Sequence, residues 1–262
     1  MIVASGLRKV FNAGTASEKI AIAGLDLEVA AADVVAVIGG NGAGKSTLLN
    51  LLGGALSADA GRIMIDGSDM TRMSEHGRSS VVARVFQDPM IGTAPSLTVG
   101  ENMTLALMRA SGRGLRRAVT RSRLDDFRAA LAGLRLGLEN RLDAQAGSLS
   151  GGQRQALALA MATLRPPKLL LLDEHTAALD PRTSELVMEA TAALVRQGRL
   201  TTLMVTHNMQ HALSYASRIV MMDAGHIVAD IGEEKAAMTV ADLVARFHLT
   251  DDRIVLARAG AR

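Results

Sequence analysis

The chain has 262 residues, of which 48% are hydrophobic and 21% charged, with a formal net charge of +3. This length fits one large domain or two modest ones with a sizeable core. The absence of cysteine excludes disulfides and thiolate metal sites and fits a reducing compartment. The chain has only four Phe, one Tyr and no Trp, so it has few aromatic side chains that could stack on the bases of a single-stranded nucleic acid. No nucleic-acid partner is therefore expected.

No segment of the sequence is suited to cross a membrane or to direct secretion. The start, Met1 to Ala4, lacks the basic region and the apolar run of a secretory signal. The longest apolar runs, such as Val34 to Ile38, are far shorter than the roughly 20 residues that span a bilayer. We expect a soluble chain that reaches a membrane only through other chains.

The N-terminal third contains strand patterns of two kinds. Apolar and polar residues alternate over Ile2 to Phe11 and Ile20 to Val29, which predicts two antiparallel strands with a turn at Asn12 to Gly14. Val34 to Ile38 is apolar throughout, which is typical of a buried strand in a parallel sheet. The other elements predicted here are a helix at Ser46–Leu52 and strands at Arg62–Ile65 and Val81–Gln87.

The region from about 88 to 148 shows no strand pattern and is predicted to be an inserted helical subdomain. Thr98 and Glu101 form a capping box ahead of a helical run to Arg109. A second helical run covers Arg121 to Leu131. The arginine-rich stretch from Arg113 to Arg128, which includes Arg116 and Arg117, is interpreted as a solvated helix face, with contact to anionic lipid headgroups as the alternative.

Strands alternate with helices again after residue 148. Ser150 is predicted to cap a helix that ends before Pro166. The other predicted elements are strands at Leu169–Asp173, Thr201–Thr206, Arg218–Asp223 and His226–Ile231 and helices at Thr183–Arg196 and Val240–Phe247. The order predicts an α/β fold with a mainly parallel core sheet, an antiparallel N-terminal β subdomain and the helical insertion.

A glycine-rich segment lies between the strand that ends at Ile38 and the helix that starts at Ser46. It fits G-x-x-x-x-G-K-S in the strand-to-helix context in which this pattern binds a nucleotide triphosphate. Its glycines let backbone N–H groups turn toward phosphate oxygens, and the helix N-terminus adds roughly half a positive charge. Lys45 is expected to reach the β- and γ-phosphates and Ser46 to ligate Mg²⁺; the alternative is a turn without a ligand. The predicted nucleotide-binding residues are Gly39, Asn41, Gly42, Ala43, Gly44, Lys45, Ser46 and Thr47.

Two acids stand at the end of the buried strand Leu169 to Asp173. Beside the glycine-rich loop, Asp173 can hold Mg²⁺ through a water. Glu174 points to the other side of the strand end and can polarise an attacking water as a general base. The alternative is that both acids only cap the next turn.

The pentapeptide Leu149 to Gln153 is a second glycine-rich helix start. Here, with the phosphate loop and the acid pair on either side, the chain resembles the ATP-binding cassette (ABC) family, whose signature sequence the pentapeptide matches without a mismatch. The resemblance implies that one subunit presents this segment to the γ-phosphate of an ATP held by another. The residues concerned are Ser150, Gly151, Gly152 and Gln153, and the alternative is a simple capped helix start.

Four further positions fit the resemblance. Gln87 matches the Q-loop glutamine, which would contact Mg²⁺ or the attacking water. His207 matches the switch histidine, which would bond the γ-phosphate and keep Glu174 and the water aligned. Asp180 matches the D-loop, which would touch the other subunit's site, and Phe11 sits where the family often has an aromatic that stacks on adenine. The alternatives are a surface glutamine, a structural histidine, a helix cap and a packed strand residue.

The resemblance covers Ile2 to Phe247 and implies a P-loop NTPase fold of the ABC ATPase type in a single domain. The expected division is an ATP-binding core at 1–87 and 149–247, a helical subdomain at about 88–148 and a short tail at 248–262. His175 departs from the family, where many members have Pro. The surrounding segment looks like ATPases of bacterial importers with a branched-chain-amino-acid-type permease, associated with tryptophan or tyrosine.

These expectations describe an ATPase subunit of a bacterial importer on the inner face of the cell membrane. Its expected partners are a second copy of itself, a membrane permease and a periplasmic substrate-binding protein, with ATP and Mg²⁺ as ligands. The alternatives are an exporter ATPase, a soluble ABC protein of translation or DNA repair, and a P-loop kinase or GTPase. A single phosphate loop and a short insertion count against the soluble ABC proteins, and Leu149 to Gln153 counts against a kinase or GTPase.

Overall fold

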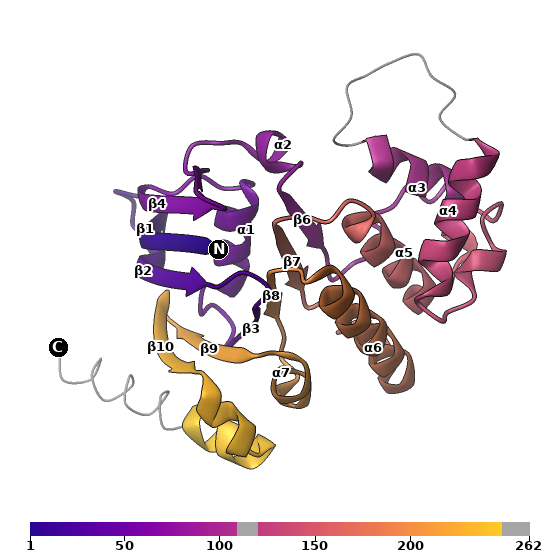
Figure 1. Ribbon diagram of the computed structural model, residues 1–262. Coiled ribbons are helices and arrows are strands. Elements are labelled where there is room, and N and C mark those ends of the chain that lie inside the picture. The colour runs from indigo at the N-terminus through magenta and orange to yellow at the C-terminus, as the bar shows by residue number, and fades with distance from the viewer. Residues whose placement is uncertain (109–119, 248–262) are drawn as a thin grey trace. The chain divides into compact units, whose positions relative to one another are not determined.

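The computed structural model describes residues 1–108 and 120–247 of the chain. These residues divide into two compact units (Figure 1). Of the described residues, unit 1 contains 1–75 and 201–247, and unit 2 contains 76–108 and 120–200. The predictions for Arg113, Arg116 and Arg117, and for the tail at 248–262, lie outside the described residues.

Unit 1 begins with the antiparallel sheet that the alternating pattern predicts. Its strand order is β2-β1-β4-β5, with β1 (Ile2–Phe11) between β2 (Lys19–Val29) and β4 (Ala60–Ile65). The three longer strands lie side by side in Figure 1. The predicted turn is confirmed, with positive φ at Asn12 (52°) and Gly14 (75°).

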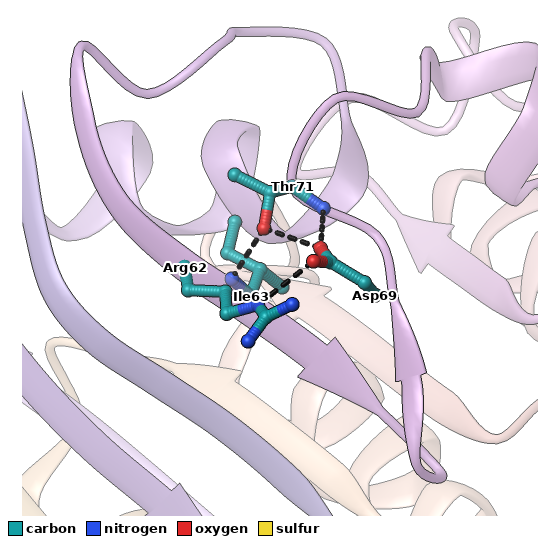
Figure 2. Close-up of polar contacts among 4 residues, drawn as sticks. All are labelled: Arg62, Ile63, Asp69 and Thr71. Atoms are coloured by element: carbon teal, nitrogen blue, oxygen red, sulfur yellow. Dashed lines mark hydrogen bonds and ion pairs between the residues drawn. The ribbon is translucent and has the colours of Figure 1, made fainter.

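A short hairpin at the edge of this sheet was not predicted. β5 (Ser68–Asp69) pairs with the end of β4 through the two-residue turn Asp66-Gly67, whose φ angles of 50° and 77° fit a type I′ turn. Figure 2 shows the hydrogen bonds behind it: the Asp69 carboxylate accepts from both the N–H and the hydroxyl of Thr71 and pairs with Arg62. The Asp-Gly pair was the available sequence signal.

A second sheet of unit 1 contains the buried apolar strand. β3 (Val34–Gly39) is parallel to β8 (Thr202–Val205) on one side and to β9 (Arg218–Asp223) on the other, and β10 (His226–Ile231) is antiparallel to β9. Val35 to Ile38 are fully buried, as their unbroken apolar run predicts. The helical elements of unit 1 are α1 (Lys45–Gly53), α7 (Met209–Tyr215), η3 (Glu233–Ala237) and residues 240–247.

Unit 2 combines a parallel strand pair with helices. β6 (Val82–Val85) is parallel to β7 (Leu169–Asp173). Between 88 and 148 the described residues contain helices and 3₁₀ turns and no strand, as predicted. The helical elements are α3 (Val99–Met108), α4 (Arg121–Ala132), η1 (Leu138–Asn140), η2 (Ala146–Ser148), α5 (Gly151–Thr163) and α6 (Pro181–Gly198), with the short α2 (Glu75–Arg78) at the border with unit 1.

Local end signals account for most helix boundaries. The Thr98 and Glu101 capping box ahead of α3 is present, with Glu101 Oε2 accepting from the Thr98 N–H at 2.7 Å. The prediction that α6 begins at Thr183 was wrong, because the helix starts at Pro181, whose fixed φ suits the first helical position. The strand predicted to reach Gln87 ends at Val85.

Candidate functional site

The glycine-rich loop joins β3 to α1 in unit 1, in the strand-loop-helix arrangement that its sequence predicts. A Cβ added at Gly39 would lie 2.3 Å from the Met222 carbonyl oxygen. Gly44, with φ of 105°, would bring a Cβ within 2.6 Å of the Ala21 oxygen. At Gly42 only the backbone φ of 82° favours glycine, because there is space for a Cβ. The loop therefore has backbone packed closely behind it at Gly39 and Gly44.

Lys45 is the first residue of α1 and is 6% exposed. Its ammonium donates to the carbonyl oxygens of Gly39 (2.8 Å) and Gly40 (3.0 Å), so the cation is held against the loop. Gly44, as N-cap, supplies no side-chain acceptor to the first turn of the helix. Positive charge from the helix N-terminus and the lysine therefore coincides at this loop, which suits an anion such as phosphate.

His207 lies at the same edge of the unit 1 sheet as the glycine-rich loop. In the parallel register Val37 pairs with Val205, so Gly39 and His207 are each two residues beyond a matched pair. His207 is exposed and lies between β8 and α7, where the Thr206 hydroxyl accepts from the Asn208 N–H. Unit 1 thus brings the predicted switch histidine and phosphate loop to one sheet edge.

Phe11 is the last residue of β1 and is partly exposed. It pairs with Lys19 across the sheet, and the Lys9 ammonium lies 5.8 Å from the centre of its ring. The ring is therefore accessible on the N-terminal sheet, although a cation already lies near it.

Unit 2 holds the predicted acid pair at the end of β7. Asp173 is the last strand residue, and its Oδ2 lies 2.5 Å from Nη2 of Arg84 on β6. Glu174 follows with a left-handed φ of 47°, a conformation that costs a non-glycine residue roughly 1–2 kcal/mol. Non-glycine residues in such sparsely populated conformations cluster at active sites and switch regions.

Gln87 lies next to the acid pair in the strand register. Val85 pairs with Leu172, so Gln87 and Glu174 are each two residues beyond a matched pair at the same end of neighbouring strands. Gln87 is exposed, and the preceding Phe86 carbonyl accepts from Nε2 of Gln155 on α5 at 3.0 Å. The predicted residues Gln87, Asp173 and Glu174 therefore meet at one edge.

The pentapeptide opens α5, and Ser150 is the N-cap, as predicted. Ser150 and Gln153 form a reciprocal capping box, and Gln153 Oε1 also accepts from Arg141 Nη1 at 3.1 Å. A Cβ added at Gly152 would lie 2.1 Å from the Thr183 side chain, so this glycine permits close packing of α5 on α6. The segment is a capped helix start, and the exposed Ser150 and Gly151 lie at that N-terminus.

Asp180 is the N-cap of α6 and accepts from the Thr183 N–H at 3.1 Å. The hydrogen bonds from Thr183 hold the pKa of the Asp180 carboxyl below its usual range. Asp180 therefore does cap a helix, which was the alternative to its predicted D-loop role, and its exposed carboxylate is ionised at neutral pH.

The sequence interpretation missed Arg84. The available signal was a single charge inside the apolar strand Val82–Val85, which has no obvious place in a buried sheet unless it is paired.

A groove of about 380 Å³ also lies within unit 2. Apart from Arg84, the described residues that line it carry no charge: they are Val85, Phe86, Pro89, Gly92, Leu105, Ala106, Ala158, Met161 and Ala162. Leu105 (52% exposed) lines it, and Met90, Ile91 (65% exposed) and Met108 are further exposed apolar side chains of the same region of the chain.

Comparison with known proteins identifies the family. The family model described as ABC transporter matches residues 22–177, and the chain belongs to this family. It is an ATPase of the ATP-binding cassette type, and its ligand is ATP. Within the described residues, no helix has the length and apolar character needed to cross a membrane.

Two curated relatives and one solved structure illustrate the match. The tyrosine transport ATP-binding protein of Clostridioides difficile is 45% identical over 85% of this chain and 89% of its own length. The lipoprotein-releasing system ATP-binding protein LolD of Ruegeria pomeroyi is 37% identical over 86% of this chain and 96% of its own. A dimeric post-hydrolysis structure of the ATP-binding cassette MJ0796 with ADP and Pi has a TM-score of 0.75 at 26% identity, over 88% and 98% of the two chains.

Proposed function

We propose that the chain is the ATP-hydrolysing subunit of a bacterial importer of a small solute such as an amino acid. The observation that carries this proposal is the 45% identity to a tyrosine transport ATP-binding protein along most of both chains. An aromatic amino acid such as tyrosine or tryptophan is the first substrate to test. The proposed division is an ATP-binding core at 1–87 and 149–247 and a helical subdomain at about 88–148.

The proposed binding of ATP starts from the unit 1 residues. Phe11 stacks on the adenine, and the phosphates lie against the backbone N–H groups of the loop and the ammonium of Lys45. The closely packed glycines and the buried lysine support this role. The loop residues are Gly39, Asn41, Gly42, Ala43, Gly44, Lys45, Ser46 and Thr47.

In the proposed reaction Glu174 is the general base. It takes a proton from a water whose oxygen attacks the γ-phosphorus, while the bond from that phosphorus to the β,γ-bridging oxygen breaks and ADP leaves. His207 bonds the γ-phosphate, and Gln87 orients the water. The strand register, which sets Gln87 beside Glu174, supports this assignment.

Mg²⁺ is the metal that the proposed site would take. Ser46 and Asp173 would hold it with Gln87, and the hydroxyl, carboxylate and amide oxygens of these residues are hard donors that fit this ion. When bound, Mg²⁺ neutralises charge that develops on the phosphate oxygens.

The first proposed partner is a second copy of the chain. Ser150, Gly151, Gly152 and Gln153 of one copy would meet the γ-phosphate held by the other, with Asp180 close to the shared site. The helix N-terminus with an exposed Ser150 supports this, because it favours an anion. ATP would then close the dimer, and hydrolysis would remove the bridge and reopen it.

The apolar groove of unit 2 is the proposed docking surface for a permease. The mainly apolar lining of the groove, which includes the exposed Leu105, suits a helix of a membrane protein, and Met90, Ile91 and Met108 are exposed apolar side chains of the same part of the chain. Closure of the dimer would then be transmitted to the permease through the segment that follows Gln87. The full system would place this chain on the cytoplasmic face and add a periplasmic substrate-binding protein.

A second candidate function is outward transport or release. The likeness to lipoprotein-releasing ATPases favours it, because 37% identity extends over most of both chains. An uptake assay separates the two. A strain that lacks this gene should lose uptake of labelled tyrosine or tryptophan, regain it with the wild-type gene and fail to regain it with Glu174→Gln. Unchanged uptake in the deletion strain would contradict the import proposal.

The shared-site proposal is tested with purified protein. Glu174→Gln should keep ATP binding, lower hydrolysis at least about a hundredfold and accumulate an ATP-dependent dimer in size-exclusion chromatography. Ser150→Arg, added to that variant, should leave ATP affinity of the monomer within about twofold and abolish the dimer, because it places a bulky cation at the proposed interface. Near-normal turnover in Glu174→Gln, or hydrolysis per chain that does not depend on protein concentration, would contradict the model.

A further inference from the structure

A single cation stands in the apolar strand β6. Nη2 of Arg84 lies 2.5 Å from Oδ2 of Asp173, and the two side chains are 14% and 17% exposed. Water screens such a pair less than it screens a pair on the surface. The interaction joins two strands of unit 2 whose residues are 89 apart in the sequence.

The strand register explains why these two side chains meet. Arg84 pairs with Leu171, so Asp173 is two residues farther along β7 and projects from the same face of the sheet. Phe86 follows Arg84 by two residues, and its ring centre lies 4.6 Å from the guanidinium carbon. The Phe86 carbonyl is in turn bonded to Gln155. The guanidinium is thus supported by Phe86 as well as by the carboxylate.

We propose that Arg84 is a positioning residue for Asp173, which rests on the proposed role of Asp173 toward Mg²⁺. The guanidinium holds Oδ2, and the described residues donate no hydrogen bond to Oδ1. One carboxylate oxygen is therefore fixed by the protein, and the other is available to a metal-bound water. Partners that orient a metal-binding carboxylate typically change metal affinity 10- to 100-fold when they are removed.

Arginine is suited to this task in a way that lysine is not. The planar guanidinium can contact a carboxylate and stack on an aromatic face at once, whereas an ammonium on a flexible stem keeps only the charge. Arg84→Lys should therefore retain part of the positioning of Asp173, and Arg84→Met should retain none of it. A pair that only joins two strands predicts a different result, namely lower stability with an unchanged response to metal.

The experiment measures metal binding separately from turnover. In full-length Arg84→Met, Arg84→Lys and wild-type protein, Mn²⁺ binding is followed by electron paramagnetic resonance with ATP present, and Mg²⁺ activation of hydrolysis is followed at saturating ATP. We expect Arg84→Met to weaken Mn²⁺ binding and to raise the Mg²⁺ concentration for half-maximal activity by about tenfold. ATP binding without metal should stay within about twofold, and Arg84→Lys should shift both metal responses by about threefold, between the wild type and Arg84→Met.

Arg62→Met is the matched control, because Arg62 also pairs with an aspartate, Asp69, at 2.8 Å, but in unit 1. It should leave both metal responses unchanged. Unaltered Mn²⁺ and Mg²⁺ curves in Arg84→Met, or equal shifts in Arg62→Met, would overturn the proposal, and if Arg84→Met does not fold, a wild-type response in Arg84→Lys would do so. Failure of the Asp173 assignment itself would appear separately, as wild-type Mn²⁺ binding in Asp173→Asn.

Discussion

Nε2 of His175 lies 3.1 Å from Oγ1 of Thr191, and both side chains are buried. The Thr191 hydroxyl donates to the Val187 carbonyl at 2.7 Å, so its oxygen accepts from His175, which must carry the proton on Nε2. This bond ties the residue that follows Glu174 to α6. The position where many family members have Pro therefore has its own side-chain anchor in this chain.

Removal of the Thr191 hydroxyl should destabilise the fold. Thr191→Val keeps the side-chain shape but leaves the buried N–H of His175 without this acceptor, and we expect a loss of about 1–3 kcal/mol in the free energy of unfolding. Urea denaturation measures the change. Thr191→Ser keeps the hydroxyl and is the control; equal losses in the two variants would show that the bond is unimportant.

The glycines of the phosphate loop should differ in their tolerance of a side chain. Gly42→Ala adds only the cost of a left-handed conformation, roughly 1–2 kcal/mol, because its nearest contact would be the flexible Lys19 ammonium at 3.9 Å. Gly44→Ala also drives a Cβ into the Ala21 carbonyl, which should add about 1–3 kcal/mol.

Urea denaturation and ATP titration together check this pair of variants. ATP binding should fall more in Gly44→Ala than in Gly42→Ala, since the Cβ displaces the backbone at the N-cap of α1. Equal effects in the two variants would mean that the close approach behind Gly44 yields to small shifts.

The hydrogen bonds of the Asp69 carboxylate at the β4–β5 hairpin predict that the stability of the fold decreases in acid. The hydrogen bonds from Thr71, with the pairing to Arg62, hold the pKa of Asp69 well below its usual range. Because this pKa is lower in the folded state, the contribution to stability is complete at neutral pH. It declines as the pH falls below the value of about 4 that the unfolded chain has.

Thermal unfolding of Asp69→Asn between pH 7 and pH 2 tests the prediction. The variant should melt below the wild type at pH 7, and the difference should narrow steadily below about pH 4. A gap that stays constant down to pH 2 would show that the carboxylate contributes through its shape and not through its charge.

Most of the fold was predictable from local patterns. Alternation fixed the β1–β2 pair, an unbroken apolar run predicted the buried β3, and caps such as Ser150 predicted helix starts. The start of α6 and the end of β6 were each misplaced by two residues, which is the range over which the ends of such elements commonly vary.

The sequence alone was enough to predict the chemistry of the candidate site, because phosphate binding and water activation require particular residue types at fixed spacing around a strand end. Only the tertiary structure decided which side chains support those residues. Arg84 meets Asp173 and His175 meets Thr191 through strand register and helix packing, which depend on the whole core; the sequence marks Arg84 only as a lone charge in an apolar strand and does not name its partner. Glu174 and Lys45 could be predicted from the chain, whereas the side chains that contact Asp173 and His175 could be found only in the fold.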